Sequence, residues 1–582
     1  MNITRMNCLV AAVVYVAAEL PPGSDESGSS WANAMTNVAA ACAKAAAQEG
    51  GGDVWLKTGL YRISSAVALA SNLRIFGGFA GTETTTAEAD SVAHPTVLHG
   101  DSSCFVDSDG GKTGIRLSGL TLREFSQSAL TVGANSEVEV QTCRFEICGD
   151  KLGLHAAVAT SGNLSLMDTE FAGCYRALDA DGGLSGPTNR LEHCTIRDCV
   201  SVSAPVIRLT NGSAPWLISS CRFQSNSVTD DATASTWCFL FQSGGVVTDT
   251  VFEDNVVQGS RSYLTYAVRV RYERCAFRRN RVILPESATV WGGVHVACAV
   301  LCKSQVADSL FEGNVVSGVL PDGRTGDVLA SCLAVLKDSE RSAVVNTTFR
   351  TNGVTVTATD APKGGTVVYQ GNPWLNGIGV ANCAFLDNDA TCDVVCQGSG
   401  TSAAENKNTS SVFINSIFWS PSDGYVPFFF ADGVTPVLLN CCVKNYDPSA
   451  LPTVESDNSR FVDRIYADVP KLKAVQSNAD GPSSVRVAAT ASRSCRRGGR
   501  PVWRDAAGDY WFYDDVRADA WKWRRLVNKL IQAEAGARLQ PPDGVTPETA
   551  PIADAFGAAR TLDRLALGPL NAEIPGALML IR

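Results

Sequence analysis

The residues best suited to contact a ligand are the arginines and tyrosines of residues 263–281, YLTYAVRVRYERCAFRRNR. Guanidinium groups bind carboxylates and sulfates through paired hydrogen bonds, and neighbouring aromatic rings add stacking contacts. If Phe277 faces the interior, alternation along a strand turns arginines such as Arg274 and Arg278 outward. The segment therefore predicts a surface for acidic or sulfated glycans, made of Arg269, Arg271, Arg274, Arg278 and Tyr272. An ordinary charged outer face is the competing interpretation.

Residues that could cleave a polysaccharide are harder to identify. Glycoside hydrolysis needs two carboxyl groups that face one bond, and adjacent acids occur at Asp230 and Asp231 and at Asp514 and Asp515. Adjacent side chains on a strand point to opposite faces, so these pairs fit solvated loops better than catalysis. No serine lies in a G-x-S-x-G motif, the turn that presents a hydrolase nucleophile. The catalytic residues of any enzyme activity are therefore unknown from the sequence.

Two acidic stretches have the composition of the start of a calcium-binding loop. They are DSDGG, with Asp107 and Asp109, and DADGG, with Asp179 and Asp181. Both lack the glutamate that closes such a loop, so turn formation is the favoured interpretation and calcium the weaker one. The five histidines are scattered and the 20 cysteines contain no CxxC pair. No metal site and no other cofactor are therefore predicted.

The candidate glycan-binding residues lie within a recurring frame, Cys-x-Phe-x-x-Asn, in which each residue type keeps a fixed offset. Successive copies start 23 to 38 residues apart, which indicates a stacked unit with loop insertions. The clearest copies are CRFQSN at Cys221, TVFEDN at Thr250, CAFRRN at Cys275, SLFEGN at Ser309, TTFRTN at Thr347 and CAFLDN at Cys383. Cys and Phe alternate with polar residues at period 2, the pattern of a strand with one buried face.

A repeat of short strands and turns fits one coil of a parallel β-helix, in which successive coils lie about 4.8 Å apart and like residues stack on like. Phenylalanines would then form an inner column, and asparagines, which tolerate left-handed backbone, would form a second column at a turn. These structural columns comprise Phe223, Phe252, Phe277, Phe311, Phe349 and Phe385, with Asn226, Asn255, Asn280, Asn314, Asn352 and Asn388. The predicted fold is all-β: a single right-handed parallel β-helix with a cap at each end.

The cysteines of the frame have two interpretations. As small side chains they fit a tight inner corner as buried free thiols, which is the favoured interpretation. Cysteines stacked one coil apart also lie within the distance that a disulfide spans, so disulfides between coils are the alternative interpretation. Cys148, Cys174 and Cys199 take the place of the asparagine early in the chain.

Bulk composition restricts the class of function. The 582 residues carry a net charge of −10, which argues against nucleic-acid binding because phosphate contacts need a basic surface. With 45% hydrophobic and 19% charged residues the chain is globular in composition. No segment is long and apolar enough to predict a transmembrane helix. Residues 8–18 fit a secretory signal or, as we prefer, a first strand at VVYVA.

Three regions are expected: an N-terminal strand and capping helix at residues 1–52, the β-helix at 53–498, and a C-terminal capping region at 499–582. Five residues share one face of the first helix, namely Trp31, Met35, Val38, Cys42 and Ala45, with Ser29 or Ser30 as N-cap and Gly50 to Gly52 as the stop. In the C-terminal region, RPVWRDAAGDYWFYDD predicts a hairpin and DAWKWRRLVNKLIQAEAGAR a basic helix.

Several stretches resemble known families. The opening, from YVAAELPPGSDESGSSWANAM to LRIFGGFAGTE, is similar to the N-terminus of secreted bacterial right-handed β-helix proteins of the pectate-lyase-like superfamily, and DAFGAARTLDRLALGPLNAE resembles a degenerate form of their ending. The FxxN copies, with GGVV, GGVH and GGTV, resemble the repeats of polymorphic outer-membrane proteins, which are β-helix adhesins. The NTD, GHG and RIK motifs of polygalacturonases are missing.

The resemblance implies a bacterial protein that is secreted or attached to the cell surface. Together with the arginine segment, it favours adhesion or glycan binding without catalysis. The alternative is a polysaccharide lyase or glycoside hydrolase that acts on acidic polysaccharide, with a site on the β-helix flank assembled from different coils. The expected partner is a polysaccharide or a host or cell-surface glycan, and a monomer is expected.

Overall fold

The structure is a computed structural model. It describes residues 12–444 with gaps and, beyond them, the backbone of five strands between residues 458 and 533. The gaps are residues 101, 182–188, 211–214, 231–234, 243, 260, 285–293, 319–327, 336–342, 357–364, 371–377, 397–409, 415, 421, 423 and 431–434.

The chain divides into two compact units. Unit 1 spans residues 1–230 and 236–246, and unit 2 spans residues 231–235 and 247–582. The boundary passes through β25 (Gly245–Thr248).

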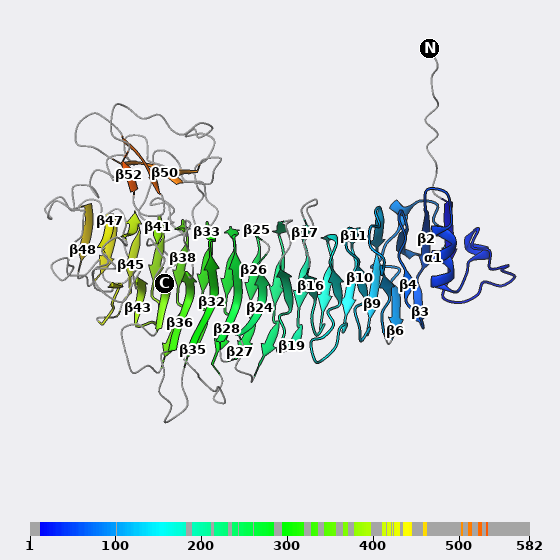
Figure 1. The fold of residues 1–582 in the computed structure, drawn as a ribbon, viewed down its shortest axis with the longest axis horizontal. Coiled ribbons are helices and arrows are strands. Elements are labelled where there is room, and N and C mark those ends of the chain that lie inside the picture. The colour runs from blue at the N-terminus through cyan, green and yellow to red at the C-terminus, as the bar shows by residue number, and fades with distance from the viewer. Residues whose placement is uncertain are drawn as a thin grey trace, which may run out of the picture. The chain divides into compact units, whose positions relative to one another are not determined.

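Each coil of unit 1 runs through a first strand, a sharp turn, a second strand and then a third strand on another sheet (Figure 1). The first strands are β1 (Ala12–Val16), β2 (Gly52–Lys57), β5 (Arg74–Phe79), β8 (Ile115–Ser118), β11 (Glu137–Gln141), β14 (Asn163–Met167), β17 (Asn189–Glu192) and β21 (Trp216–Ser219). The second strands are β3 (Gly59–Ile63), β6 (Thr96–Gly100), β9 (Leu120–Arg123), β12 (Arg144–Glu146), β15 (Glu170–Ala172), β18 (Thr195–Arg197) and β22 (Arg222–Gln224). The third strands are β4 (Val67–Ala68), β7 (Phe105–Val106), β10 (Leu130–Val132), β13 (Val158–Thr160), β16 (Leu178–Asp181), β20 (Ile207–Thr210) and β24 (Ser235–Phe241), and β19 (Val200–Val202) and β23 (Ser227–Thr229) add a further sheet.

Unit 2 repeats the same order. Its first strands are β29 (Val270–Glu273), β33 (Gln305–Ala307), β37 (Ala343–Val345), β41 (Gly379–Ala381), β44 (Ser410–Ile414), β47 (Thr435–Lys444) and β48 (Asn458–Val462). Its second strands are β26 (Val251–Glu253), β30 (Ala276–Arg278), β34 (Leu310–Glu312), β38 (Thr348–Arg350), β42 (Ala384–Leu386) and β45 (Ile417–Trp419). Its third strands are β28 (Arg261–Val268), β32 (Val294–Cys302), β36 (Val328–Val335), β40 (Gly365–Gln370), β43 (Cys392–Cys396) and β46 (Phe428–Phe430), and the further sheet holds β27 (Val256–Gln258), β31 (Arg281–Ile283), β35 (Val315–Gly318) and β39 (Gly353–Val356).

The strands of successive coils pair in parallel and in register, for example Phe145 with Phe171 in unit 1 and Phe277 with Phe311 in unit 2. Parallel strands joined by a crossover connection take the right-handed sense. The predicted right-handed parallel β-helix is therefore confirmed.

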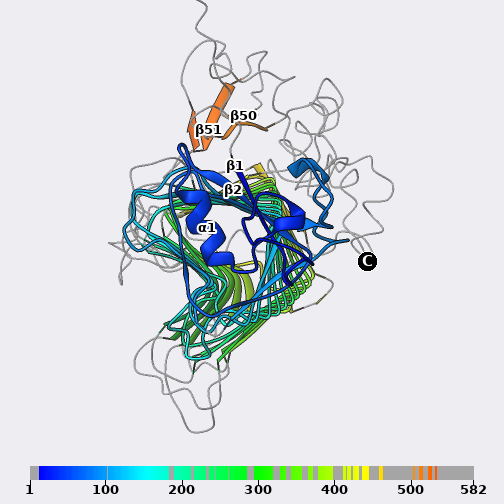
Figure 2. The same cartoon turned by 90° about the vertical axis from the view of Figure 1, so that its right-hand side faces the viewer.

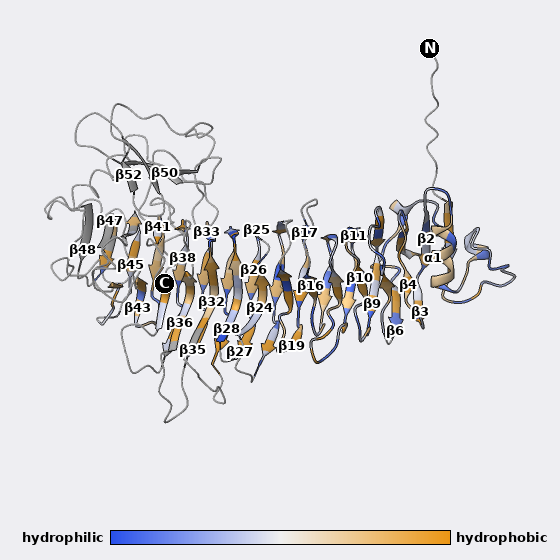
Figure 3. Ribbon diagram, viewed as in Figure 1, coloured by the Kyte–Doolittle hydropathy of each residue, from blue (hydrophilic) through white to orange (hydrophobic). Residues whose placement is uncertain are grey.

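Inward-facing side chains stack into columns, and the strands carry most of the hydrophobic colour in Figure 3. In unit 2 the rings lie 4.5 to 4.8 Å apart with interplanar angles of 6° to 17°, through Phe252, Phe277, Phe311, Phe349, Phe385 and Phe418. In unit 1, Phe145 stacks on Phe171 at 4.8 Å, and the column continues through Ile196 to the buried Phe223. Each buried ring contributes roughly 2 to 3 kcal/mol.

Two turns of the frame place a residue in left-handed backbone. One precedes the Cys position of the frame, such as Arg274 with φ 52°, and one precedes the Asn position, such as Arg279 with φ 51°. Left-handed backbone costs a non-glycine residue roughly 1 kcal/mol. At both places the turn residue lies at the surface while the next residue, Cys275 or Asn280, is buried.

The asparagines of unit 2 form a continuous buried ladder. In each, Oδ1 accepts hydrogen bonds from the residue of the preceding coil, and Nδ2 donates to a backbone carbonyl there; Asn280 Nδ2, for example, lies 2.8 Å from Phe252 O. In unit 1, Cys174 Sγ donates to Phe145 O at 3.4 Å and thus replaces the amide donor.

The Cys position of the frame is a hydrogen-bonding position. Cys275 Sγ donates to Glu273 O, two residues before it, at 3.4 Å, and Ser309 Oγ makes the equivalent bond to Ala307 O at 2.7 Å. The cysteines whose side chains the structure describes are free and buried. The structure thus agrees with buried thiols and not with disulfides between coils, and at the Cys position of the frame the thiol caps the turn.

The N-terminal segment begins with β1, which pairs in parallel with β2, so the prediction of a first strand is confirmed. The expected helix is shorter than predicted: a 3-10 turn, Trp31–Asn33, capped by Ser30, precedes α1 (Val38–Ala46), which begins after the N-cap Asn37. Helix α1 packs against β1, β2 and β4 (Figure 2).

The C-terminal strands form a separate antiparallel sheet. β49 (Val502–Arg504) and β50 (Tyr510–Asp514) pair as the predicted hairpin. The helix expected at residues 519–538 is wrong where the structure describes it, because Lys522–Leu526 and Ile531–Ala533 are the strands β51 and β52. Whether either terminal region caps the β-helix stays a prediction.

Candidate functional site

The predicted arginines lie on the outer side of β29 and β30 and at the turns beside them. Arg269 and Arg274 are exposed, and Arg271 and Arg278 are partly exposed. Tyr272 is the exception: it is 0% exposed and packs edge-on against Phe252 and Phe277. Its place on the binding surface was therefore predicted wrongly.

Tyr272 faces inward because the residue at the turn, Arg274, has left-handed backbone. Alternation counted back from Phe277 turns Tyr272 outward, but Arg274 has φ 52° and interrupts the extended chain. The alternation restarts beyond the turn, so Tyr272 and Val270 face inward. Arg271 and Glu273 then face outward and form an ion pair with each other.

Arg274 is fixed by the carboxylate of Asp249 in the preceding coil of unit 2. Nε lies 2.6 Å from Oδ1 and Nη2 lies 2.7 Å from Oδ2, and Nη2 also donates to Thr248 Oγ1 at 2.5 Å. This pairing lowers the pKa of Asp249 and raises that of Arg274. Both side chains stay about half exposed, at 51% for Arg274 and 45% for Asp249.

A second pair of the same kind occupies the next turn. Arg279 Nε and Nη2 lie 2.8 and 2.7 Å from the carboxylate of Asp254, and the hydrogen bonds raise the pKa of Arg279. All four residues of the two pairs have positive φ, from 51° to 55°. Between the pairs, Arg278 lies 3.6 Å from Glu312 of the following coil. We name these two Arg–Asp pairs, with β26 and β30 between them, the paired flank.

The paired flank changes the expected ligand chemistry. Three of the predicted arginines, Arg271, Arg274 and Arg278, lie beside carboxylates, so a polyanion would meet as many acids as guanidinium groups. Arg269 has no ion pair among the described side chains. Asp249 and Asp254 were not among the predicted site residues, although they hold the same offsets in the frame as Arg274 and Arg279.

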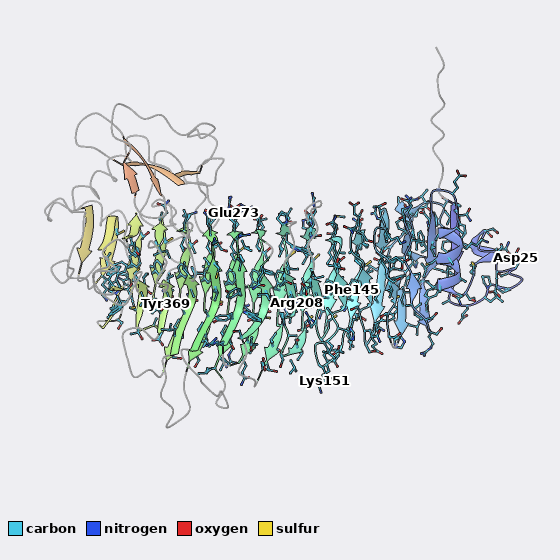
Figure 4. The ribbon with its side chains drawn as sticks, in the orientation of Figure 1. Asp25, Phe145, Lys151, Arg208, Glu273 and Tyr369 are labelled. Atoms are coloured by element: carbon cyan, nitrogen blue, oxygen red, sulfur yellow. The ribbon has the colours of Figure 1, made fainter. Side chains whose placement is uncertain are left out.

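In the two calcium-like stretches, aspartate side chains accept hydrogen bonds from other groups of the protein. Asp107 accepts hydrogen bonds from the backbone of Gly110 and Gly133, at 2.9 and 3.2 Å, as expected of a turn. Asp179 receives a bidentate bond from Arg208, at 2.6 and 3.0 Å (Figure 4). The described side chains include no group of three or more His, Cys, Asp or Glu residues placed to hold a metal ion.

Of the two acidic pairs of the sequence, the structure describes the side chain of Asp230 alone. Asp230 is buried and accepts from Ser203 Oγ at 3.1 Å, whereas Asp231 and the side chains of Asp514 and Asp515 lie outside the described residues.

One buried acid carried no signal in the sequence. Asp393 is 2% exposed, in β43, and its carboxylate accepts from Asn388 Nδ2 at 3.2 Å and from the hydroxyl of Tyr425. Burial raises its pKa to about 7. Asp393 thus receives the last amide of the asparagine ladder, a position that only the fold reveals.

No protein-family model and no curated protein matches the sequence. Among solved structures, the chain is similar to the surface adhesin PfbA of Streptococcus pneumoniae, with 14% identity over 61% of this chain and 86% of that one and a TM-score of 0.32. It is similar to a tailspike mutant of E. coli bacteriophage HK620 in complex with a hexasaccharide, with 13% identity, coverage of 69% and 70%, and a TM-score of 0.29. It is also similar to the alginate lyase AlyF-OU02 in complex with G6, with 13% identity over 60% of this chain and 83% of that one and a TM-score of 0.29. These neighbours are pectate-lyase-like parallel β-helix proteins.

Within the described part of the chain, no helix has the length and apolar character needed to cross a membrane.

Proposed function

We propose that the protein binds glycan chains through the paired flank, as a secreted or cell-surface adhesion or binding protein. The observation that carries the proposal is the bidentate pairing of Arg274 with Asp249 on an exposed, repeated turn. Adjacent guanidinium and carboxylate groups offer donors and acceptors side by side, which is what the hydroxyl groups of a sugar require.

Rigidity supports the proposal. The paired residues sit at left-handed turns, and the residue after each turn, Cys275 or Asn280, is hydrogen-bonded into the buried interior. A ligand therefore meets groups whose positions are already fixed, and little conformational entropy is lost on binding. The near balance of charge favours hydroxyl-rich, uncharged sugars over the acidic glycans that the sequence suggested.

The test is retention on a panel of immobilised polysaccharides that includes neutral glucans and mannans, pectins, glycosaminoglycans and mucin glycans. The parent protein should be retained by at least one neutral glycan without releasing new reducing ends. The double variant Arg274→Gln and Arg279→Gln should bind that glycan at least about tenfold more weakly, because charge-assisted hydrogen bonds contribute about 1.5 to 3 kcal/mol each.

Arg208→Gln is the matched control, because Arg208 makes the same bidentate bond to Asp179 but lies in unit 1. It should bind like the parent. Equal retention of the double variant would remove the paired flank from the proposal. New reducing ends or unsaturated products would favour the alternative of a lyase or hydrolase.

A further inference from the structure

A loop of unit 1 between β12 and β13 holds two leucines in solvent. Leu152 is 76% exposed and Leu154 is 71% exposed. The neighbouring Lys151 lies at the outer margin of the ribbon in Figure 4. Large apolar side chains exposed to this degree lose the free energy that burial would provide.

The loop is held firmly in this arrangement. The carboxylate of Asp150 accepts hydrogen bonds from the backbone N–H groups of Leu154 and His155, at 3.1 and 2.6 Å. From beneath, the buried guanidinium of Arg176 donates to Gly153 O at 2.9 Å. Specific hydrogen bonds therefore fix the loop in the conformation that exposes the two leucines.

The loop adjoins other exposed apolar side chains. The Cα of Gly153 packs so closely on β19 that an added Cβ would lie 3.2 Å from Val202 O and 2.9 Å from Ala204 Cβ. Val200 and Val202, on the outer face of β19, are 51% and 41% exposed, and Ile147, the first residue of the loop, is 48% exposed. We name Ile147, Leu152, Leu154, Val200 and Val202 the apolar corner.

A positively charged residue, Lys151, lies beside the two exposed leucines of the apolar corner. Lys151 is exposed and forms no ion pair with any described side chain. The adjacent carboxylate of Asp150 is turned toward the backbone of its own loop. An ammonium group next to protruding leucines complements the phosphate and acyl layers of a lipid surface.

We infer that the apolar corner docks the protein on a lipid bilayer, with Leu152 and Leu154 inserted between the headgroups and Lys151 at the phosphate level. The small extent of the corner favours this partner. A stable protein interface uses about 20 to 30 residues on each side, whereas binding to a membrane surface scales with the apolar area that is inserted and adds the attraction of basic residues for anionic lipids. This inference is independent of the glycan proposal, because the paired flank belongs to unit 2.

The test is flotation of the full chain with vesicles of phosphatidylcholine alone, or mixed equally with phosphatidylglycerol. The parent should float with both and more strongly with the mixed vesicles. Leu152→Ser with Leu154→Ser should lower the partition coefficient at least about tenfold on both, from the apolar area lost. Lys151→Glu should lower it roughly fivefold or more, and only on the mixed vesicles.

Val92→Ser is the control, because Val92 is 91% exposed in unit 1 outside the apolar corner; it should float like the parent. Failure of the parent to float with either vesicle would overturn the inference, as would equal flotation of the double leucine variant. Attachment to cells that depends on the leucines while vesicles stay unbound would also overturn it, in favour of a protein partner.

Discussion

Asn280 and Asn314 lie one coil apart in unit 2, and the amide nitrogen of Asn280 donates to Oδ1 of Asn314 at 2.9 Å. The same Oδ1 accepts the backbone N–H of Asn280 at 3.1 Å. Each amide therefore satisfies a backbone group that the sharp turn leaves without a strand partner. In unit 2 the asparagine ladder thus supplies the hydrogen bonds that the buried backbone groups at this turn require.

Asn280→Leu should destabilise the fold far more than it weakens any ligand binding. Leucine removes the bonds to Phe252 O and to Asn255, and it leaves these buried groups unsatisfied. Unsatisfied buried groups cost about 1 to 3 kcal/mol each, so a loss of roughly 3 to 5 kcal/mol is expected. Urea unfolding measures it. Gln258→Leu, a partly exposed site in the preceding coil, should change little; equal thermal midpoints for Asn280→Leu and the parent would contradict the ladder.

Cys275→Ser should be tolerated, whereas Cys275→Val should not. The thiol of Cys275 donates to Val247 O and Glu273 O, and serine holds the equivalent place at Ser309. Serine keeps the donor and valine removes it, so valine should cost about 1 to 3 kcal/mol more. Denaturant midpoints of the two variants decide the matter. A valine variant as stable as the serine variant would mean that Cys275 serves only as a small apolar residue.

Phe311→Ala should destabilise unit 2 by about 3 to 5 kcal/mol, the range for removing a buried aromatic ring. Its ring stacks on Phe277 at 4.5 Å and on Phe349 at 4.8 Å, so a cavity would open against two neighbours. Phe311→Leu, which fills most of the space, should cost less than half as much. The comparison is made by urea unfolding, and a cost below about 1 kcal/mol for the alanine variant would show that coils do not share a continuous column.

The fold could be predicted because each copy of the frame shows, within six residues, which side chains face inward and where the chain turns. Phe at one offset and Asn three residues later recur, and stacking in register follows from a repeat that cannot bury its own face. The paired flank was predictable in principle from the same frame. Asp249 and Arg274 share one offset, so the register of the coils alone places them together.

The failures have specific causes. Tyr272 was misplaced because the left-handed Arg274 restarts the alternation of side chains, and no sequence rule marks that residue as left-handed. In the C-terminal region, the strand Lys522–Leu526 is only five residues long, and so short a run cannot separate period 2 from period 3.6. Asp393 follows Asn388 by five residues but meets its amide only after the chain has bent into β43.

Asp393 should make the stability of the protein fall as the pH rises. Burial raises its pKa from 3.8 to about 7 in the folded protein, so the folded state holds the proton more tightly than the unfolded state does. Its contribution is fully present below about pH 4 and is lost as the pH rises through about 7, by roughly 4 kcal/mol at most. Asp393→Asn keeps an oxygen that accepts from Asn388, places an amide nitrogen that can donate to the Tyr425 hydroxyl, and removes the titration. Urea unfolding of parent and variant between pH 4 and pH 8 should give curves that diverge in this window, with the parent losing stability relative to the variant. Parallel curves would show that Asp393 titrates alike in both states, and a parent that gains stability over the variant as the pH rises would show that the Tyr425 and Asn388 hydrogen bonds outweigh burial.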